Sequence, residues 1–103
     1  MKNLSFLIIG GLLVALSPAL ACEGEAQFIA KVGSRNFSLS QGCKVTLAEV
    51  RYFSSNPFCP LSLEEINTSG LLVGTLNGHE CAYDIGDDVS GVAVKQGARL
   101  ILE

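Results

Sequence analysis

The chain has 103 residues, of which seven are Lys or Arg and ten are Asp or Glu, so it carries a net charge of −3 at pH 7. A chain of this length forms a single domain. Its basic residues are scattered rather than clustered, which argues against nucleic acid as a partner, because binding to phosphates depends on a basic patch.

The N-terminus carries the features of an export signal. Lys2 gives a short positive segment, residues 4–16 form a charge-free apolar run, and residues 19–21 supply the small-x-small pattern that signal peptidases cleave. The apolar run is shorter than the roughly 20 residues that a membrane-spanning helix needs, so we expect no membrane span. The sequence therefore predicts a cleaved signal peptide over residues 1–21 and one small β-rich domain over residues 22–103, exported to the periplasm or the extracellular space.

The sequence contains four cysteines, Cys22, Cys43, Cys59 and Cys81. In a small exported domain an even set indicates disulfide bonds, because the compartment is oxidising and the core is small. If the first two predicted strands form a hairpin around residues 35–41, Gly33 lies opposite Cys43 and Cys22 lies opposite the segment before Cys59. This register favours the pairs Cys22–Cys59 and Cys43–Cys81 among the three possible connectivities. The second pair would contribute about 4 kcal/mol of stability.

Cys22 has a second interpretation as a lipid-anchor residue. Residues 19–22 resemble a lipoprotein signal, although the usual order of a large aliphatic residue before a small one is reversed in Ala19-Leu20. Acylation would also leave three cysteines, one of them without a partner. The disulfide interpretation is favoured, and a membrane-anchored lipoprotein with acylated Cys22 is the alternative.

The first half of the mature sequence alternates apolar and polar residues, which is typical of half-buried strands. Strands are predicted over residues 25–33 and 43–53, joined by the polar, turn-rich segment 34–42. In the second strand the apolar positions change parity, with Val45-x-Leu47 on one face and Val50-x-Tyr52 on the other. A strand does this at a β-bulge, which bends it and lets it serve two faces of a barrel.

The second half begins with segment 54–67, where two prolines exclude a central strand. Ser62 and Glu65 form a capping-box pattern that predicts a short helix over residues 63–67. Four further strands are predicted over residues 70–78, 80–85, 89–95 and 98–103, with tight turns at Asn77-Gly78, 86–88 and Gln96-Gly97.

Together these elements predict a mainly β fold, a small antiparallel barrel of five or six strands with one short helix. The outline is that of an OB-like barrel stabilised by disulfides, because so short a chain cannot cover both faces of a large sheet. The alternative is an open antiparallel sheet with one helix. Barrels of this kind host unrelated functions, so the architecture does not specify one.

His79, the only histidine, lies beside Glu80 and Cys81 and could suggest a metal site or a nucleophile. Zinc needs three or four convergent ligands, and a nucleophilic cysteine needs a free thiolate, which a disulfide removes. Because His79 follows the Asn77-Gly78 turn, we expect it at an exposed hairpin tip. It is therefore predicted to have no catalytic or metal-binding role.

Three acidic residues, Asp84, Asp87 and Asp88, flank Gly86. They lack the length and alternation of a calcium loop and match the composition of ordinary turns. We predict no metal, no cofactor and no enzymatic activity.

The loop 57–61 is the remaining candidate for function. Two prolines and a predicted disulfide would hold Phe58 and Leu61 in fixed positions, and an ordered apolar loop loses little entropy on docking. Alternatively, both side chains plug the end of the barrel, and this is the favoured interpretation of the pattern.

Taken as a whole, the sequence predicts a monomeric, non-enzymatic binding or envelope-structural module with an unknown protein or small-molecule ligand. The alternative function is a secreted protease inhibitor or effector acting through residues 57–61.

Overall fold

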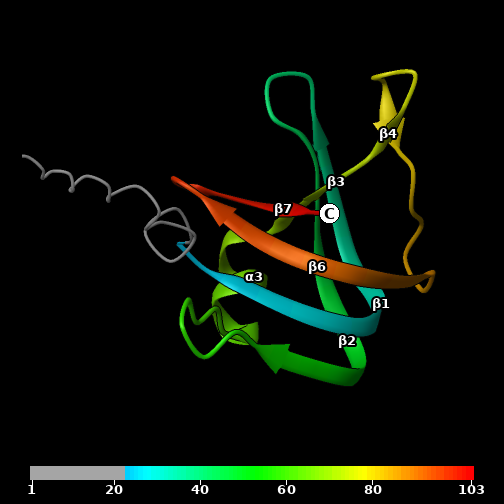
Figure 1. Ribbon diagram of the computed structural model, residues 1–103. Coiled ribbons are helices and arrows are strands. Elements are labelled where there is room, and N and C mark those ends of the chain that lie inside the picture. Colours follow the sequence, from blue (N-terminus) through cyan, green and yellow to red (C-terminus); the bar gives the residue numbers. More distant parts are fainter. Residues whose placement is uncertain (1–22) are drawn as a thin grey trace, which may run out of the picture.

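The computed structural model describes residues 23–103, in which five strands form a closed barrel. These strands are β1 (Glu25–Ser38), β2 (Gly42–Ser55), β3 (Leu71–Val73), β6 (Asp88–Gln96) and β7 (Arg99–Leu102). The other elements are the helix α3 (Leu63–Ser69) and a two-stranded sheet of β4 (Thr75–Leu76) and β5 (Glu80–Cys81). The barrel has the order β1-β2-β3-β7-β6 and closes where β6 pairs with β1 (Figure 1).

The predicted small barrel with one short helix after the second strand is confirmed, and an open sheet does not form. The barrel is mixed rather than wholly antiparallel, because β3 and β7 pair in parallel. The chain leaves β3, passes through β4, β5 and β6, and returns in the same direction, which is the long connection that a parallel pair requires. The predicted signal peptide and Cys22 lie outside the described residues.

The hairpin of β1 and β2 is longer than the sequence predicts. Segment 34–42 was expected to be a connection, but β1 continues to Ser38, and the turn consists only of residues 39–41. As a result Phe37, and not Gly33, lies opposite Cys43. Residues 33–36 are polar or small because this part of the hairpin is exposed on both faces, and not because the chain turns there.

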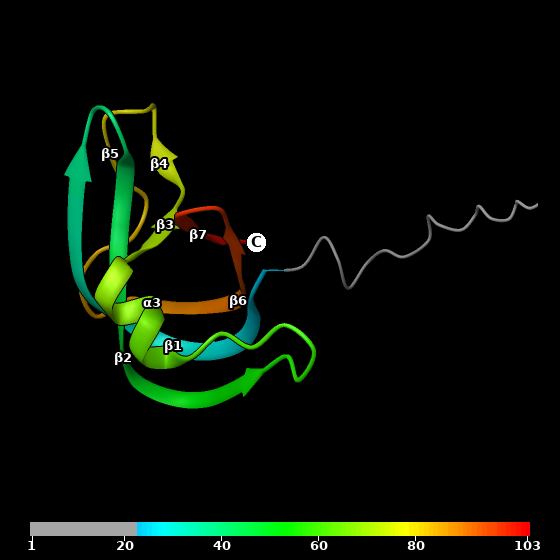
Figure 2. The same cartoon turned by 90° about the vertical axis from the view of Figure 1, so that its left-hand side faces the viewer.

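The predicted β-bulge in β2 is present at Glu49, whose φ is 45°. On either side of the bulge Ile29 pairs with Tyr52 and Lys31 pairs with Ala48. Between these two pairs β2 has residues 49–51, where β1 has only Ala30. The bulge divides β2 into a first arm, residues 42–48, and a second arm, residues 50–55, which run in different directions (Figures 1 and 2).

The parity change at the bulge differs in one detail from the prediction. Val45 and Leu47 are buried before the bulge, and Val50 and Phe53 pack on the core after it. Tyr52, which was expected to share a face with Val50, is instead 47% exposed. The irregular backbone around Glu49 shifts the inward position of the second arm to Phe53.

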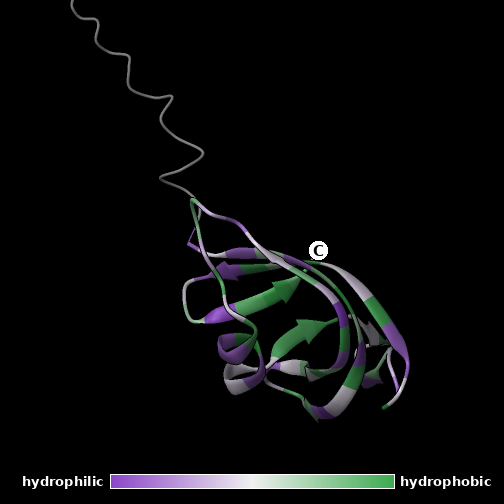
Figure 3. Cartoon of the chain, turned by 90° about the horizontal axis from the view of Figure 1, so that it is seen from below, coloured by the Kyte–Doolittle hydropathy of each residue, from purple (hydrophilic) through white to green (hydrophobic). Residues whose placement is uncertain are grey.

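The core is built around Phe28, which is almost fully buried opposite Gly91 of β6. Small residues beside it, Ala26, Ala30 and Ala93, leave room for the ring. Gly91 has a φ of 147°, and a Cβ there would lie 2.7 Å from the backbone oxygen of Glu103. Figure 3, coloured by hydropathy, shows apolar stretches along the strands of the barrel.

Helix α3 closes one end of the barrel. The Ser62 hydroxyl accepts a hydrogen bond from the Glu65 N–H at 3.0 Å, which confirms the predicted cap, and the helix buries Ile66. The Glu65 carboxylate accepts a hydrogen bond from Lys95 Nζ at 2.7 Å, which ties the helix to β6. This contact raises the pKa of Lys95 above its usual value.

The Asn67 side chain holds the other end of α3 against β2. Its Oδ1 accepts a hydrogen bond from the Leu47 N–H at 2.8 Å, and its Nδ2 donates one to the Leu47 carbonyl at 3.1 Å. A single amide thus takes the place of a neighbouring strand at Leu47, where the ladder with β3 has ended.

The predicted Cys43–Cys81 disulfide is present, with the two Cα atoms 5.3 Å apart. It joins β2 to β5, and the hairpin of β4 and β5 turns at Asn77-Gly78 as predicted, with positive φ at both residues. Cys59 is buried and carries no free thiol. The predicted Cys22–Cys59 pair includes a residue outside the described range and stays a prediction.

Candidate functional site

A groove of about 310 Å³ lies where the second arm of β2 runs into the following loop. Its lining comes from β1, from β2 and from the loop, and consists of Glu25, Ala26, Gln27, Ser54, Ser55, Asn56, Pro57 and Phe58. Phe58 stands at its edge with 86% of its surface exposed. A single exposed apolar side chain is ordinary on a protein surface, but one that stands on a groove marks the place as a candidate interface.

The loop that carries Phe58 is held in one conformation by Asn56. The Asn56 Oδ1 accepts hydrogen bonds from the N–H groups of Phe58 at 2.8 Å and Cys59 at 3.3 Å. The Asn56 N–H donates to the Glu25 carbonyl at 2.8 Å, and the Glu25 N–H donates to the Cys59 carbonyl at 2.9 Å. The loop is therefore pinned to β1 on both sides of Phe58.

Leu61 does not belong to this surface. It is only 1% exposed and forms part of the core, and its N–H donates a hydrogen bond to the Ser55 hydroxyl at 2.9 Å. The two apolar residues of the predicted binding loop thus have opposite roles, because the chain turns inward after Pro60 to begin α3. Phe58 alone remains available to a partner.

The groove continues onto the outer face of β1, β2 and β6. A second, shallower depression of about 260 Å³ shares Gln27 with it and includes Ile29, Tyr52 and Ser90 among its lining residues. Ile29 and Tyr52 are cross-strand partners, and both are exposed. The alternation of Ile29 with Phe28 in the sequence places Ile29 on the polar face of the strand, and its exposure agrees with this, but no binding role was predicted for it.

The far end of this face is charged. Lys31 Nζ lies 3.0 Å from the Asp88 carboxylate, and Arg51 lies 3.7 Å from it. The hydrogen bond and positive charge of Lys31, with a smaller contribution from Arg51, hold the pKa of Asp88 below its usual value. Asp88 of β6 therefore forms ion pairs with Lys31 of β1 and Arg51 of β2.

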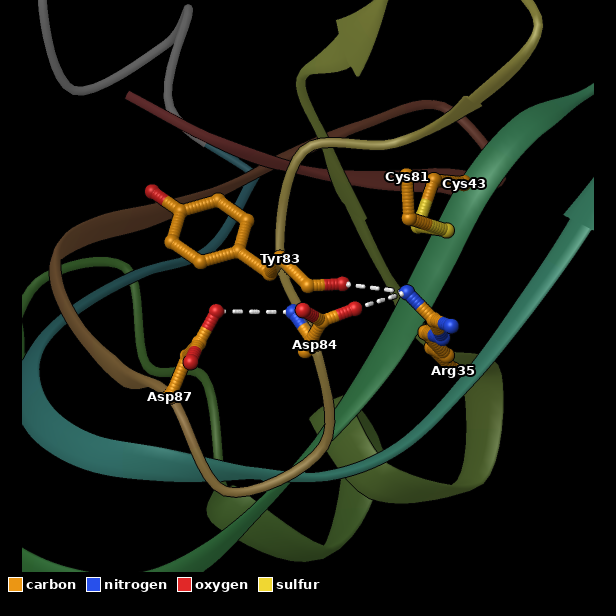
Figure 4. Close-up of polar contacts among 6 residues, drawn as sticks. All are labelled: Arg35, Cys43, Cys81, Tyr83, Asp84 and Asp87. Atoms are coloured by element: carbon orange, nitrogen blue, oxygen red, sulfur yellow. Dashed lines mark hydrogen bonds and ion pairs between the residues drawn. A yellow bond between two sulfur atoms is a disulfide. The ribbon is translucent and has the colours of Figure 1, made fainter.

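The other two acidic residues also have structural partners (Figure 4). Arg35 Nη1 donates to the Asp84 carboxylate at 2.6 Å and to the Tyr83 carbonyl at 3.0 Å. The Asp87 carboxylate accepts a hydrogen bond from the Asp84 N–H at 2.8 Å. These contacts fix the turn after β5 to β1, close to the Cys43–Cys81 disulfide. Asp84 and Asp87 therefore have the contacts of an ordinary structured turn.

His79 lies exposed in the turn between β4 and β5, as expected, and its N–H donates to the Leu76 carbonyl at 3.1 Å. Among residues 23–103, no cluster of three or more His, Cys, Asp or Glu side chains could hold a metal ion. In the same part of the chain, no helix has both the length and the apolar character needed to cross a membrane.

Comparison of the chain with protein-family models, with curated proteins and with solved structures finds no match in any of the three.

Proposed function

We propose that this protein is an exported, non-enzymatic binding module that takes a partner at the groove beside Phe58. The observation that carries the proposal is the exposure of Phe58, a large apolar side chain on a loop already fixed by Asn56. Aromatic residues supply much of the binding energy of protein interfaces. A loop that is ordered before binding loses little entropy when it docks.

A binding role suits the groove better than catalysis does. The lining offers one carboxylate, from Glu25, among hydroxyl, amide and apolar side chains. General acid–base chemistry needs a group whose proton affinity is tuned and a second group to work with it. The only histidine, His79, lies in the β4–β5 turn, away from the loop that carries Phe58 (Figures 1 and 2).

The Cys43–Cys81 disulfide is typical of an oxidising compartment, which supports export. We propose that the predicted signal peptide directs the domain to the periplasm or the extracellular space. A lipid anchor on Cys22 is the alternative. The intact mass of protein from its native host, before and after reduction and alkylation, distinguishes the two. A soluble domain begins at Cys22 with no added mass, whereas a lipoprotein carries a diacylglycerol and an acyl chain.

Site-specific photocrosslinking tests the binding proposal. Benzoylphenylalanine replaces Phe58 in one variant and Leu39 in a matched control, since both residues are 86% exposed and lie in different loops. We expect irradiation of living cells to give one discrete crosslinked species from position 58 and none from position 39. Equal crosslinking at both positions, or none at either, would contradict the proposal.

The inhibitor alternative now rests on residues 57–60, because Leu61 is buried. The ordered loop favours this alternative, because many protease inhibitors bind the protease through an ordered loop. It predicts stoichiometric inhibition of a protease that is lost in Phe58→Ala, with folding unchanged. If a broad panel of serine, cysteine and metalloproteases shows no inhibition, only the binding module remains.

A further inference from the structure

The second arm of β2 has a free edge, and we propose that it binds an extended segment of a partner polypeptide as an added strand. This inference rests on the proposed function and names the class of ligand. The strand would lie against residues 50–55 and continue past the end of the arm to Phe58. Peptides are bound in this mode through backbone hydrogen bonds, while alternate side chains provide specificity.

The pairing of the barrel strands shows where the edge lies. β2 pairs with β3 only through Cys43–Val45, and Asn67 takes the place of a strand at Leu47. Within residues 23–103, all ladder partners of the second arm belong to β1. Figures 1 and 2 show this arm as the outermost strand on its side of the barrel, with α3 on the inner side.

Two hydrogen bonds establish which backbone groups face outward. The Asn56 N–H donates to the Glu25 carbonyl, so odd-numbered residues of β1 direct their backbone groups toward β2. The Lys95 N–H donates to the Gly24 carbonyl, so even-numbered residues direct theirs toward β6. Because Tyr52 and Ser54 lie opposite odd-numbered residues of β1, the alternation of an antiparallel ladder turns the N–H and C=O of Phe53 away from β1.

This edge has only part of the protection that exposed strands usually have. Natural edges are blunted by β-bulges, charged side chains, lysine or proline. The Glu49 bulge precedes the second arm and Arg51 carries a charge, but the sequence Val-Arg-Tyr-Phe-Ser-Ser contains neither lysine nor proline, and its Val, Tyr and Phe favour strands. Such a segment is suited to pairing with another chain.

The geometry of β2 favours a partner segment over a second copy of this protein. An edge of six residues is about 20 Å long, and a strand pair of this length buries less than the roughly 1,200 Å² of a specific stable interface. The rest must come from contacts beyond Ser55, at the groove and Phe58. A second copy paired antiparallel would reach this point at its own Glu49 bulge, where its strand bends away.

The side chains on the outer face indicate which residues the bound segment should contain. Tyr52 and Ile29 are exposed next to the edge, and Phe58 lies beyond it. Every second side chain of the added strand falls on this face. We therefore expect an extended, proline-free segment with apolar side chains at alternate positions.

The test uses linear dodecapeptides displayed on phage and selected on the folded mature protein, followed by synthesis of the best binder. Amide hydrogen exchange is then measured by NMR, with Tyr52 and Ser54 as internal controls because their N–H groups pair with β1. In the free protein we expect Phe53 to exchange about tenfold or more faster than both. The bound peptide should slow Phe53 by a similar factor and leave the controls unchanged.

Two peptides of the same sequence, N-methylated at the odd-numbered or at the even-numbered residues, are the matched controls. Both keep every side chain, but only one loses the donors that face β2, so we expect the affinity of that one to fall at least about tenfold. The proposal is overturned if both methylated peptides bind as well as the unmodified one, if no dodecapeptide binds, or if Phe53 is already protected in a dimer. A peptide that needs Phe58 but leaves Phe53 exchange unchanged would retain the proposed function and reject the added strand.

Discussion

Replacing Asn67 by alanine should destabilise the protein more than any other single change of a polar side chain in α3. The substitution removes the two hydrogen bonds, at 2.8 and 3.1 Å, that the amide makes with the N–H and C=O of Leu47. Both bonds are partly buried, so the backbone groups they leave behind are only partly rehydrated. The result tests whether this side chain replaces a strand at the point where the β2–β3 ladder ends.

The magnitude follows from the cost of unsatisfied groups. Each buried donor or acceptor left without a partner costs about 1–3 kcal/mol, and partial exposure places both groups near the lower half of this range. Alanine recovers up to about 0.7 kcal/mol as the better helix former. We therefore expect a net loss of about 1.5–3 kcal/mol, which corresponds to a fall in Tm of about 6–24 °C for a domain of this size.

Thermal and urea unfolding followed by circular dichroism measure this loss. Asn36→Ala is the control, because Asn36 has the same side chain at an exposed position of β1, where a change should stay within about 0.5 kcal/mol. If Asn67→Ala and Asn36→Ala unfold at the same urea concentration, the Asn67 amide does not support the edge of β2 and the reasoning is refuted.

Three further predictions concern other parts of the fold. Reduction of the disulfide between β2 and β5 should cost about 4 kcal/mol, and an unchanged melting curve with reductant would contradict its role. Lys31→Ala should raise the pKa of Asp88 toward its usual value in an NMR carboxyl titration. Because the pKa of Asp88 is lowered in the folded state, the ion pair stabilises the protein near neutral pH, and this contribution disappears as the pH falls through the folded-state pKa. Gly91→Ala should destabilise the protein by about 1–3 kcal/mol, because the φ of Gly91 is 147° and the new Cβ would lie 2.7 Å from a backbone oxygen. Gly74→Ala is the control and should be nearly neutral, because its Cβ would meet no atom closer than 4.0 Å.

The features that the sequence predicted correctly have local causes. Ser62 caps a helix through a residue three positions away, and Asn77-Gly78 makes a tight turn through its own backbone preferences. The bulge could be inferred because a change of parity is visible in the order of apolar residues. The strand order could not be inferred, because it depends on which distant segments pair.

The errors arose where tertiary packing decides the outcome. The polar residues 34–36 indicated a turn, but they belong to a strand exposed on both faces. Phe58 and Leu61 have similar local surroundings, and only the position of the barrel end determines that Leu61 is buried and Phe58 exposed. The role of Asn67 is equally non-local, since its partner lies 20 positions earlier in the chain.

The affinity of the partner captured by crosslinking at position 58 tests the central claim most directly. Isothermal titration with Phe58→Ala and Leu39→Ala compares two truncations of equally exposed apolar side chains. If Phe58 anchors the interface, its loss should weaken binding by at least about 2 kcal/mol, or roughly 30-fold in Kd, while Leu39→Ala binds like the wild type. Equal affinities for both variants would show that the groove beside Phe58 is not where this protein binds.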